Sequence, residues 1–317
     1  MIDNIKLKVS WKDDALLLER LENSYRRDIN TYSGNLQNMG VHRNLDGLHI
    51  HGSLAKYYSG ENITPLTLRQ VEEAITMLEV ETGIELNTAL LKGVELGVSI
   101  FTKEKPSEYL RLFGSRTRFT RHEYSSLGGV ETITYSNPKG SFQFSGYDKA
   151  NEVIQKHKRI PAKFEGLNIL RLEYKIVRRR GIKAKFHRDL TAYDLFNPAV
   201  YKKLQSLFLE AYQAIPKFGR QFYIDISENI TPKKWNVVLA EQYRHSFPNE
   251  YRTLLQSLRE SGAVSDKSFE RIRATERRRE RGYRLVDRSP LIEELDEEVG
   301  SIMICPYNSD MILAEGK

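Results

Sequence analysis

The sequence predicts an α+β fold, in which a central antiparallel β-sheet with flanking helices is followed by a mainly helical C-terminal region. Several segments alternate apolar and polar residues or are rich in β-branched residues, and two of them flank a hairpin turn. After about residue 225 these strand patterns give way to short helical patterns and a strongly charged tail. We therefore expect one sheet domain over residues 1–225 and a helical accessory region over residues 226–317.

The first elements follow in order from these patterns. Residues 5–11 (IKLKVSW) alternate apolar and polar side chains and predict a strand. Residues 47–60 (GLHIHGSLAKYYSG) predict a second strand and then a short, turn-rich connection. A helix is expected to begin at Thr67, because Thr67 and Gln70 have the spacing of a capping box and an apolar stripe follows them. Gly83 lies just past the expected end of this helix.

The later elements are predicted by the same criteria. Residues 93–101 (GVELGVSIF) are rich in β-branched residues and predict a strand. Residues 129–149 predict a hairpin, since the turn sequence SNPKG separates two strand-like runs. Residues 167–177 (LNILRLEYKIV) predict another strand, and Asn197 with Pro198 starts an amphipathic helix.

Composition and charge narrow the class of protein. The 317 residues include 49 Lys and Arg against 42 Asp and Glu, and the net charge of +7 favours a polyanionic partner, with nucleic acid first. Cys305 is the only cysteine, so an internal disulfide and a Cys-rich zinc site are excluded. No apolar run approaches the length of a membrane span, and the N-terminal stretch lacks a signal-like apolar core. These features predict a cytoplasmic protein without a membrane partner.

A pair of histidines is the first candidate for chemistry. His49 and His51 are two residues apart in a predicted strand, so their side chains point to the same face. Two neighbouring imidazoles suit a divalent cation, but a complete site needs a third ligand. The alternative is that one histidine is hydrogen-bonded in the core while the other contacts solvent.

Two strands carry acidic residues among apolar ones. Glu95 faces away from Val94 and Leu96, and Arg171 and Glu173 share one face of their strand. Glu95 can belong to a functional centre, and so can the pair of Arg171 and Glu173. The alternative is an exposed carboxylate at residue 95 and an exposed ion pair in the other strand, which contributes little to stability.

A tyrosine in the segment SGYDKANE is the fourth candidate. Tyr147 can act as a nucleophile toward phosphorus if its proton is removed, and Lys149 can supply positive charge beside it. The sequence has 17 tyrosines, however, and most of them must pack in the core or lie on the surface. From the residues alone, both interpretations stay open.

These motifs together resemble the replication initiators of filamentous phages (the gene II and gene X products), a divergent branch of the His-hydrophobe-His nicking endonucleases. MIDNIKLKVSW is similar to the family's opening strand, and HIHGSLAKYYSGEN contains a matching S-x-x-K…G-x-N pattern. VELGVSI, GYDKANE and LRLEYKI follow in the family's order, over about the first 200 residues. The chain departs from the pattern at Glu95, where the family more often has Asp preceded by Arg-Ile, and the phage members do not keep both histidines.

The resemblance implies a rolling-circle replication initiator that nicks and rejoins single-stranded DNA at a specific site. In that family the residue at the position of Tyr147 attacks the DNA and forms a 5′-phosphotyrosine, and Lys149 is the accompanying cation. Mg²⁺ or Mn²⁺ would be held by some of His49, His51, Glu95 and Glu173. The implied partners are single-stranded or supercoiled origin DNA, a host helicase and a host polymerase.

Basic segments are the expected DNA contacts. Residues 113–124 interleave arginines with aromatics, and residues 177–188 form a second basic segment. The predicted contacts are Lys56, Arg116, Arg118, Arg121, Arg178, Arg179, Arg180 and Lys183. The alternative for each is a solvated charged face. The role of the arginine-rich residues 270–288, and of Tyr193 as a second tyrosine, stays open.

Other functions share part of this pattern. A conjugative relaxase or a single-strand transposase would use the same tyrosine and metal on a different DNA site. A non-catalytic DNA-binding repressor would use the sheet and the basic segments alone. A nicking assay separates the repressor from the enzymes.

Overall fold

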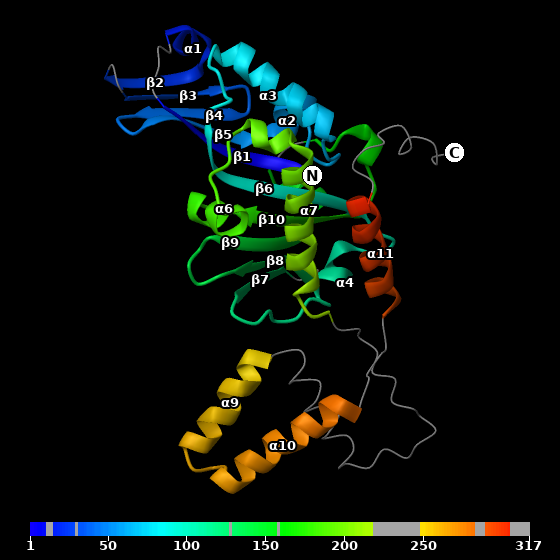
Figure 1. Ribbon diagram of the computed structural model, residues 1–317. Coiled ribbons are helices and arrows are strands. Elements are labelled where there is room, and N and C mark those ends of the chain that lie inside the picture. The colour runs from blue at the N-terminus through cyan, green and yellow to red at the C-terminus, as the bar shows by residue number, and fades with distance from the viewer. Residues whose placement is uncertain are drawn as a thin grey trace.

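Ten strands form one antiparallel sheet in the order β2-β3-β4-β5-β1-β6-β10-β9-β8-β7 (Figure 1). The computed structural model describes residues 1–10, 15–28, 31–126, 129–156, 159–217, 248–282 and 289–304. The strands are β1 (Ile2–Val9), β2 (Glu22–Asp28), β3 (Thr31–Leu36), β4 (Met39–Asn44), β5 (Gly47–Ser53), β6 (Leu90–Phe101), β7 (Thr120–Ser126), β8 (Gly129–Ser136), β9 (Phe142–Asp148) and β10 (Ile169–Ile176). The predicted antiparallel sheet with flanking helices is confirmed.

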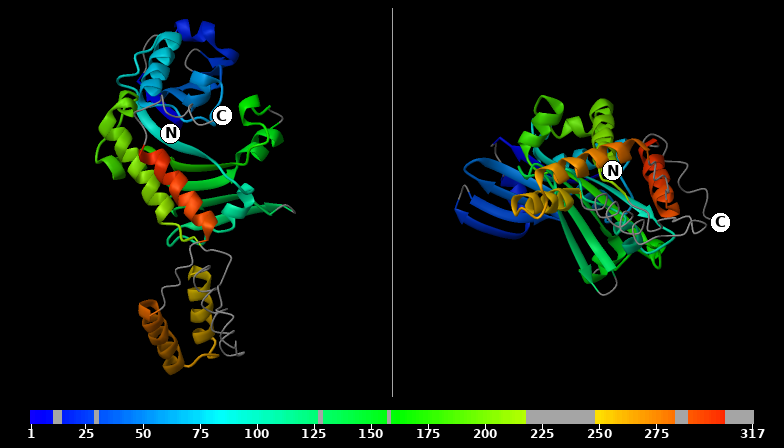
Figure 2. Two further views of the ribbon diagram at one scale, coloured as in Figure 1. Left: turned by 90° about the vertical axis from the view of Figure 1, so that its right-hand side faces the viewer. Right: turned by 90° about the horizontal axis from the view of Figure 1, so that it is seen from below.

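Helices and short 3-10 turns connect and cover these strands. In chain order they are α1 (Ala15–Arg20), α2 (Leu54–Ser59), α3 (Leu68–Thr82), α4 (Pro106–Leu110), α5 (Lys149–Gln155), η1 (Ala162–Phe164), α6 (Arg179–Phe186), η2 (Tyr193–Phe196), α7 (Pro198–Gln213), α9 (Pro248–Glu260), α10 (Asp266–Gly282) and α11 (Pro290–Ile304). Figure 2 shows α7 and α11 side by side over one face of the sheet.

The two faces of the sheet differ in chemistry. The face toward α7 is apolar: Leu96, Val98 and Leu172 are buried there, and the rings of Phe144 and Phe208 are 5.8 Å apart. The opposite face, called the polar face below, carries Glu95, Arg171, Glu173 and Tyr147 together with the residues that oppose them in register. This alternation follows from the period of two along each strand.

Several local predictions are confirmed and one is wrong. Thr67 caps α3 with the reciprocal bonds of a capping box to Gln70, and Gly83 ends the helix in the left-handed conformation at φ 68°. Asn197 caps α7. The connection after β5 is not a turn-rich loop but the helix α2, because the Ser53 side chain accepts a hydrogen bond from the backbone of the third residue beyond it.

The C-terminal helices divide into two groups. Figure 1 shows α9 and α10 away from the sheet, whereas α11 packs against it. Leu295 and Val299 of α11 are fully buried in the same core as the sheet residues, and Asp296 accepts a 2.5 Å hydrogen bond from the Tyr212 hydroxyl of α7. The predicted domain boundary near residue 225 lies outside the described residues.

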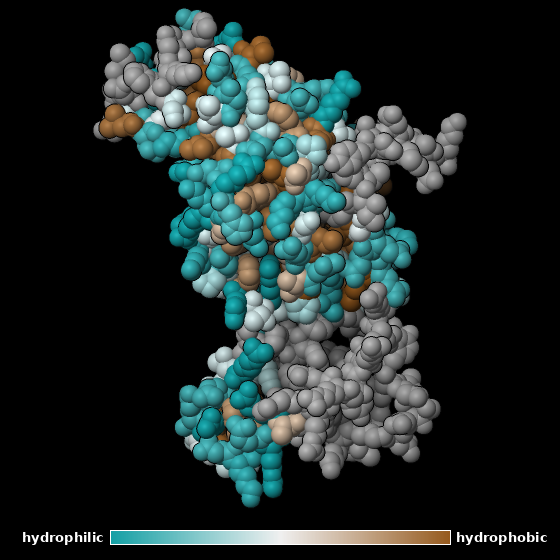
Figure 3. Space-filling view, viewed as in Figure 1, coloured by the Kyte–Doolittle hydropathy of each residue, from teal (hydrophilic) through white to brown (hydrophobic). Residues whose placement is uncertain are grey.

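Most of the visible surface is hydrophilic in Figure 3, both over the sheet domain and over α9 and α10. Within the described ranges, no helix combines the length and the apolar character that crossing a bilayer requires.

Candidate active site on the polar face

Three carboxylates from adjacent strands meet on the polar face. Asp3 of β1, Glu95 of β6 and Glu173 of β10 each place an oxygen within 4.8 Å of the others. The strands β1, β6 and β10 are consecutive in the sheet, so their side chains can converge although their residues lie far apart in sequence. Asp3 and Glu173 are buried, and Glu95 is half-buried.

A bulge in β1 brings Asp3 to this face. Ile2 pairs with Leu96 and Ile5 pairs with Val94, so β1 has one extra residue in this stretch. Asp3 and Asn4 therefore both lie opposite Glu95, and the Asn4 side chain donates a 2.9 Å hydrogen bond to Glu95.

Asp3 is held by the segment that follows β5. Ser53 Oγ donates to Asp3 Oδ1 at 2.5 Å, and Asn62 Nδ2 donates to Asp3 Oδ2 at 2.8 Å. Ser53 also caps α2, which ends at Gly60 in the left-handed conformation (φ 78°). The serine, glycine and asparagine of the S-x-x-K…G-x-N pattern thus have a structural role, because together they position one carboxylate of the candidate site.

Arg171 lies at the centre of the cluster with 1% of its surface exposed. Its guanidinium contacts Asp3 and Glu173 and donates to Asn62 O at 2.8 Å and Ser99 Oγ at 3.0 Å. The alternative interpretation, an exposed ion pair in this strand, is therefore wrong, because Arg171 and Glu173 are buried and Asn62 contacts the guanidinium. A buried arginine of this kind is stable only when its donors are paired.

Gly97 makes room for that guanidinium. A Cβ atom at this position would lie 1.9 Å from Arg171 Nη2 and 2.3 Å from Arg171 Cζ. No side chain other than hydrogen fits there while Arg171 keeps its contacts.

Lys175 bridges the other two carboxylates. Its ammonium lies 2.7 Å from Glu95 Oε2 and 2.9 Å from Glu173 Oε2. Burial and the neighbouring Glu173 raise the pKa of Glu95. Burial opposes ionisation of Glu173 as well, but Arg171 and then Lys175 lower its pKa below the ordinary value. A proton in this group therefore resides on Glu95 rather than on Glu173.

Tyr147 reaches the cluster from β9. It opposes Arg171 in register, and its hydroxyl donates a 2.7 Å hydrogen bond to Glu173 Oε1. Burial, and then the negative charge of Glu173, raise the pKa of the Tyr147 hydroxyl far above its ordinary range. The resting tyrosine is therefore neutral, with its proton directed at a carboxylate.

Lys149 stands next to this tyrosine at the first position of α5, where Asp148 caps the helix. Its side chain is 2% exposed, and its ammonium is 2.8 Å from Glu152 and 5.8 Å from the centre of the Tyr147 ring. The predicted pair is thus adjacent, although Lys149 is on a helix rather than on an extended strand.

The structure does not bring His49 and His51 into this group. Both side chains are on the polar face, opposite Lys8 and Lys6 respectively, but β5 is two strands from β6, which corresponds to about 10 Å. The His51 ring packs over Gly40 of β4, where an added Cβ would lie 2.7 Å from it.

His49 has neighbours of its own. It lies 6.4 Å from the His42 ring and 3.8 Å from Asp46. Among the residues that the structure describes, the carboxylate group contains Asp3 and no histidine.

The predicted DNA contacts are scattered. Lys56 is half-buried on α2, and Arg118 and Arg178 are exposed. Arg116 stacks 3.8 Å from the Phe119 ring centre, and Arg121 pairs with Glu123 at 2.5 Å; Arg121 also opposes Tyr135, whose side chain is on the apolar face.

In the second basic segment, most side chains make contacts within the protein. Arg179 and Lys183 pair with Asp189 at 2.6 and 3.1 Å, and Arg180 donates to Ser141 Oγ at 2.7 Å. Tyr193, the possible second tyrosine, donates to Glu79 of α3 at 2.9 Å and is not part of the carboxylate group. Part of the arginine-rich range 270–288 lies outside the described residues.

Sequence reasoning missed Asp3 and Lys175. For Asp3 a signal existed: Ile2 and Ile5 are three residues apart, whereas Ile5, Leu7 and Val9 alternate, and such a break in period indicates a bulge. For Lys175 the signal was its position two residues after Glu173 on the same face.

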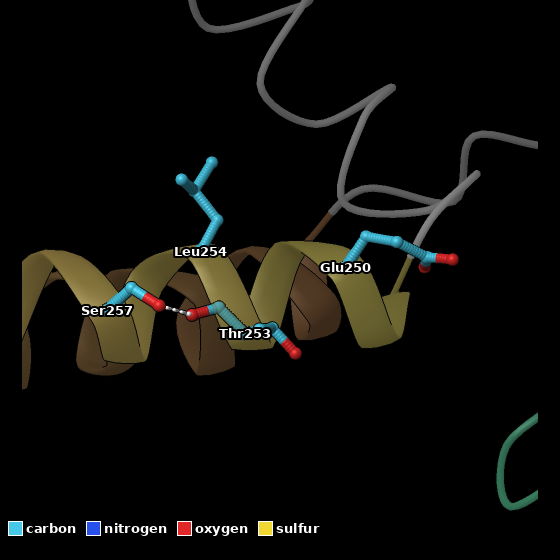
Figure 4. A pocket seen from close by; sticks show the side chains of 4 residues that line it. All are labelled: Glu250, Thr253, Leu254 and Ser257. Carbon is cyan, nitrogen blue, oxygen red and sulfur yellow. Dashed lines mark hydrogen bonds between the residues drawn. The ribbon is translucent and has the colours of Figure 1, made fainter.

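A pocket beside α9 is unrelated to this group. It is lined by Glu250, Thr253, Leu254 and Ser257, all from one helix (Figure 4). A single carboxylate on one helix offers no converging set of ligands.

Comparisons with known proteins leave the family open. No protein-family model matches the sequence, and no curated protein matches it significantly. A solved structure, "Structure of Rolling Circle Replication Initiator Protein from Geobacillus stearothermophilus", aligns with 76% of this chain and 95% of its own, at 11% identity and a TM-score of 0.37. A likeness at that level establishes neither family nor function.

Proposed function

We propose that the protein is a rolling-circle replication initiator that nicks and rejoins single-stranded DNA through Tyr147. The observation that carries this proposal is the 2.7 Å contact between the Tyr147 hydroxyl and Glu173. Two further carboxylates and three cationic side chains lie around this contact: Asp3, Glu95, Lys149, Arg171 and Lys175. A half-buried tyrosine that is neutral at rest, hydrogen-bonded to a carboxylate and close to cations, suits attack on a phosphodiester.

The bonds exchanged in this reaction balance without an outside energy source. The Tyr147 oxygen forms a bond to phosphorus, the bond from phosphorus to the 3′ oxygen breaks, and the released strand end takes up a proton as a 3′-hydroxyl. The tyrosine proton is relayed through Glu173, which already accepts its hydrogen bond, to the departing 3′ oxygen. Because the phosphodiester energy is kept in the 5′-phosphotyrosine, the reverse reaction rejoins the strand.

The carboxylates fit a divalent cation. Asp3, Glu95 and Glu173 offer only oxygen ligands, which Mg²⁺ and Mn²⁺ prefer, and they replace the histidines as the favoured ligand set. When bound, the ion would polarise the scissile phosphate and offset its developing negative charge. Arg171 fixes the orientation of Asp3 and Glu173, and Lys149 adds positive charge beside the tyrosine.

The DNA strand is expected to lie on the polar face. Lys6 is exposed on this face, and Lys8 and Lys92 lie near His49, where Lys8 pairs with Asp46 at 2.6 Å. Of the contacts predicted from the sequence, Arg118, Arg178, Arg180 and Lys183 are exposed. Phosphate contacts by these side chains would make binding strongly dependent on salt.

A nicking assay with two matched tyrosine variants tests the proposal. The substrate is circular single-stranded DNA that carries the region around the protein's own gene, incubated with Mn²⁺. Wild-type protein is expected to give a DNA adduct that protease removes, and Tyr147→Phe is expected to give none. The control is Tyr124→Phe, because Tyr124 opposes Thr132, which in turn opposes Tyr147, on the same face.

The outcomes separate the candidate functions. An adduct from Tyr147→Phe at the wild-type level would overturn the assignment of the nucleophile, and nicking that persists in EDTA would overturn the metal site. A non-catalytic repressor would bind DNA and give no adduct with any variant. A relaxase or a transposase would give the adduct on a transfer origin or an element end instead, and host helicase and polymerase partners would apply to the initiator alone.

A further inference from the structure

A small apolar cluster occupies the polar face beside the candidate active site. Its buried members are Ile63, Phe164 and Ile169, packed against Ile160. Ile169 opposes Phe101 in register, two residues before Arg171 on the same strand, so this cluster adjoins the guanidinium that holds Asp3 and Glu173.

Phe101 covers the end of this cluster with an exposed ring. The Phe101 and Phe164 rings are stacked at 5.7 Å with an interplanar angle of 17°, yet Phe101 remains 48% exposed. The Lys163 ammonium lies 4.6 Å from the centre of the Phe164 ring. The same ammonium lies 3.4 Å from Glu61 Oε1. One stacked aromatic is therefore buried beneath a cation, and the other offers an exposed ring surface.

This surface is close enough to Tyr147 to contact the same DNA strand. Tyr147, Arg171 and Ser99 form one transverse row of the sheet, and Phe101 is two residues beyond Ser99 on β6. Two strand spacings and two residues along a strand place Phe101 about 12 Å from Tyr147 between Cα atoms. A few nucleotides bridge that span, since even stacked nucleotides are about 3.4 Å apart.

We propose that Phe101, supported by Phe164 and Lys163, is a stacking site for a nucleobase of the single strand near the scissile phosphate. This inference rests on the proposed function for its ligand. A half-exposed aromatic ring backed by a second ring has the flat, rigid surface on which bases stack. Lys163 is exposed and can exchange its 3.4 Å contact with Glu61 for the adjoining phosphate. Stacking of this kind is tolerant of base identity, so the site would position the strand rather than read its sequence.

The test measures binding without cleavage. A fluorescently labelled oligothymidylate of about 16 nucleotides is titrated with full-length protein in EDTA, and anisotropy gives the affinity. Phe101→Leu is expected to weaken binding by about fivefold to a hundredfold, because it removes the stacking surface while keeping an apolar side chain. The matched control is Tyr25→Leu, since Tyr25 is 67% exposed on the far edge strand of the same sheet and is expected to leave affinity unchanged.

Two further measurements identify the base as the ligand. Phe101→Trp is expected to retain affinity, and its added indole fluorescence is expected to be quenched by oligothymidylate but not by an abasic strand of equal length. With the abasic strand, Phe101→Leu and wild type are expected to bind equally.

Each failure has a separate meaning. Equal affinity of Phe101→Leu and wild type for oligothymidylate would overturn the stacking site and leave this apolar surface to a protein partner. Equal losses from Phe101→Leu and Tyr25→Leu would overturn it too. If these binding results hold while wild-type protein forms no adduct on DNA, the stacking site stands and the proposed nicking function is wrong.

Discussion

Gly97 offers a direct test of the buried charge cluster, through the substitution Gly97→Ala. The added methyl carbon would lie 1.9 Å from Arg171 Nη2, far inside van der Waals contact. The guanidinium must then move, and it cannot move into solvent because it is 1% exposed. Its bonds to Asn62 and Ser99 and its ion pairs with Asp3 and Glu173 would be lost or distorted.

The expected loss in the free energy of unfolding is large for the addition of a single methyl group. Loss of one partner from a buried ion pair lowers the free energy of unfolding by about 3–5 kcal/mol. For a domain of this size, that corresponds to a fall in Tm of roughly 10 °C, measured by differential scanning calorimetry. The control is Gly166→Ala, where φ is 76° and no atom lies within 4 Å, so only about 1 kcal/mol of backbone strain is expected.

A double-mutant cycle isolates the cause. In the background of Arg171→Ala the clash partner is gone, so adding Gly97→Ala is expected to cost little. If Gly97→Ala alone unfolds no earlier than Gly166→Ala, the guanidinium does not occupy the space over Gly97, and the packing of the cluster described above is wrong.

Three further predictions concern neighbouring contacts. Ser53→Ala removes the 2.5 Å hydrogen bond to the buried Asp3 and is expected to lower the free energy of unfolding by about 1–3 kcal/mol in urea titrations; no change would refute the anchoring role. Lys175→Met removes the cation that occupies the carboxylate group and is expected to raise Mn²⁺ affinity at least about tenfold by calorimetry; weaker binding would contradict this. Tyr212→Phe removes the bond to Asp296 and is expected to cost about 1 kcal/mol in urea titrations; no change would argue against this contact between α7 and α11.

Local features of the sequence were enough to predict much of the sheet and its caps. The alternation in LRLEYKI placed Arg171 and Glu173 on one face, and the pair Thr67 and Gln70 marked a helix start that the structure confirms. These predictions succeed because side-chain direction in a strand and a capping box depend only on residues close in sequence.

The tertiary structure alone decided which candidates meet. The sequence places a tyrosine, two histidines and several carboxylates on strands, but strand order and register bring Asp3 to Glu95 and Glu173 and keep His51 two strands away from Glu95. The tertiary structure also decides between the two interpretations of Arg171 and Glu173: both are buried, and the backbone of Asn62 accepts a hydrogen bond from Arg171. The bonds of Asp3 to Asn62 and to Arg171 join residues 59 and 168 positions apart, so strand pairing and packing determine them, and no local pattern in the chain encodes them.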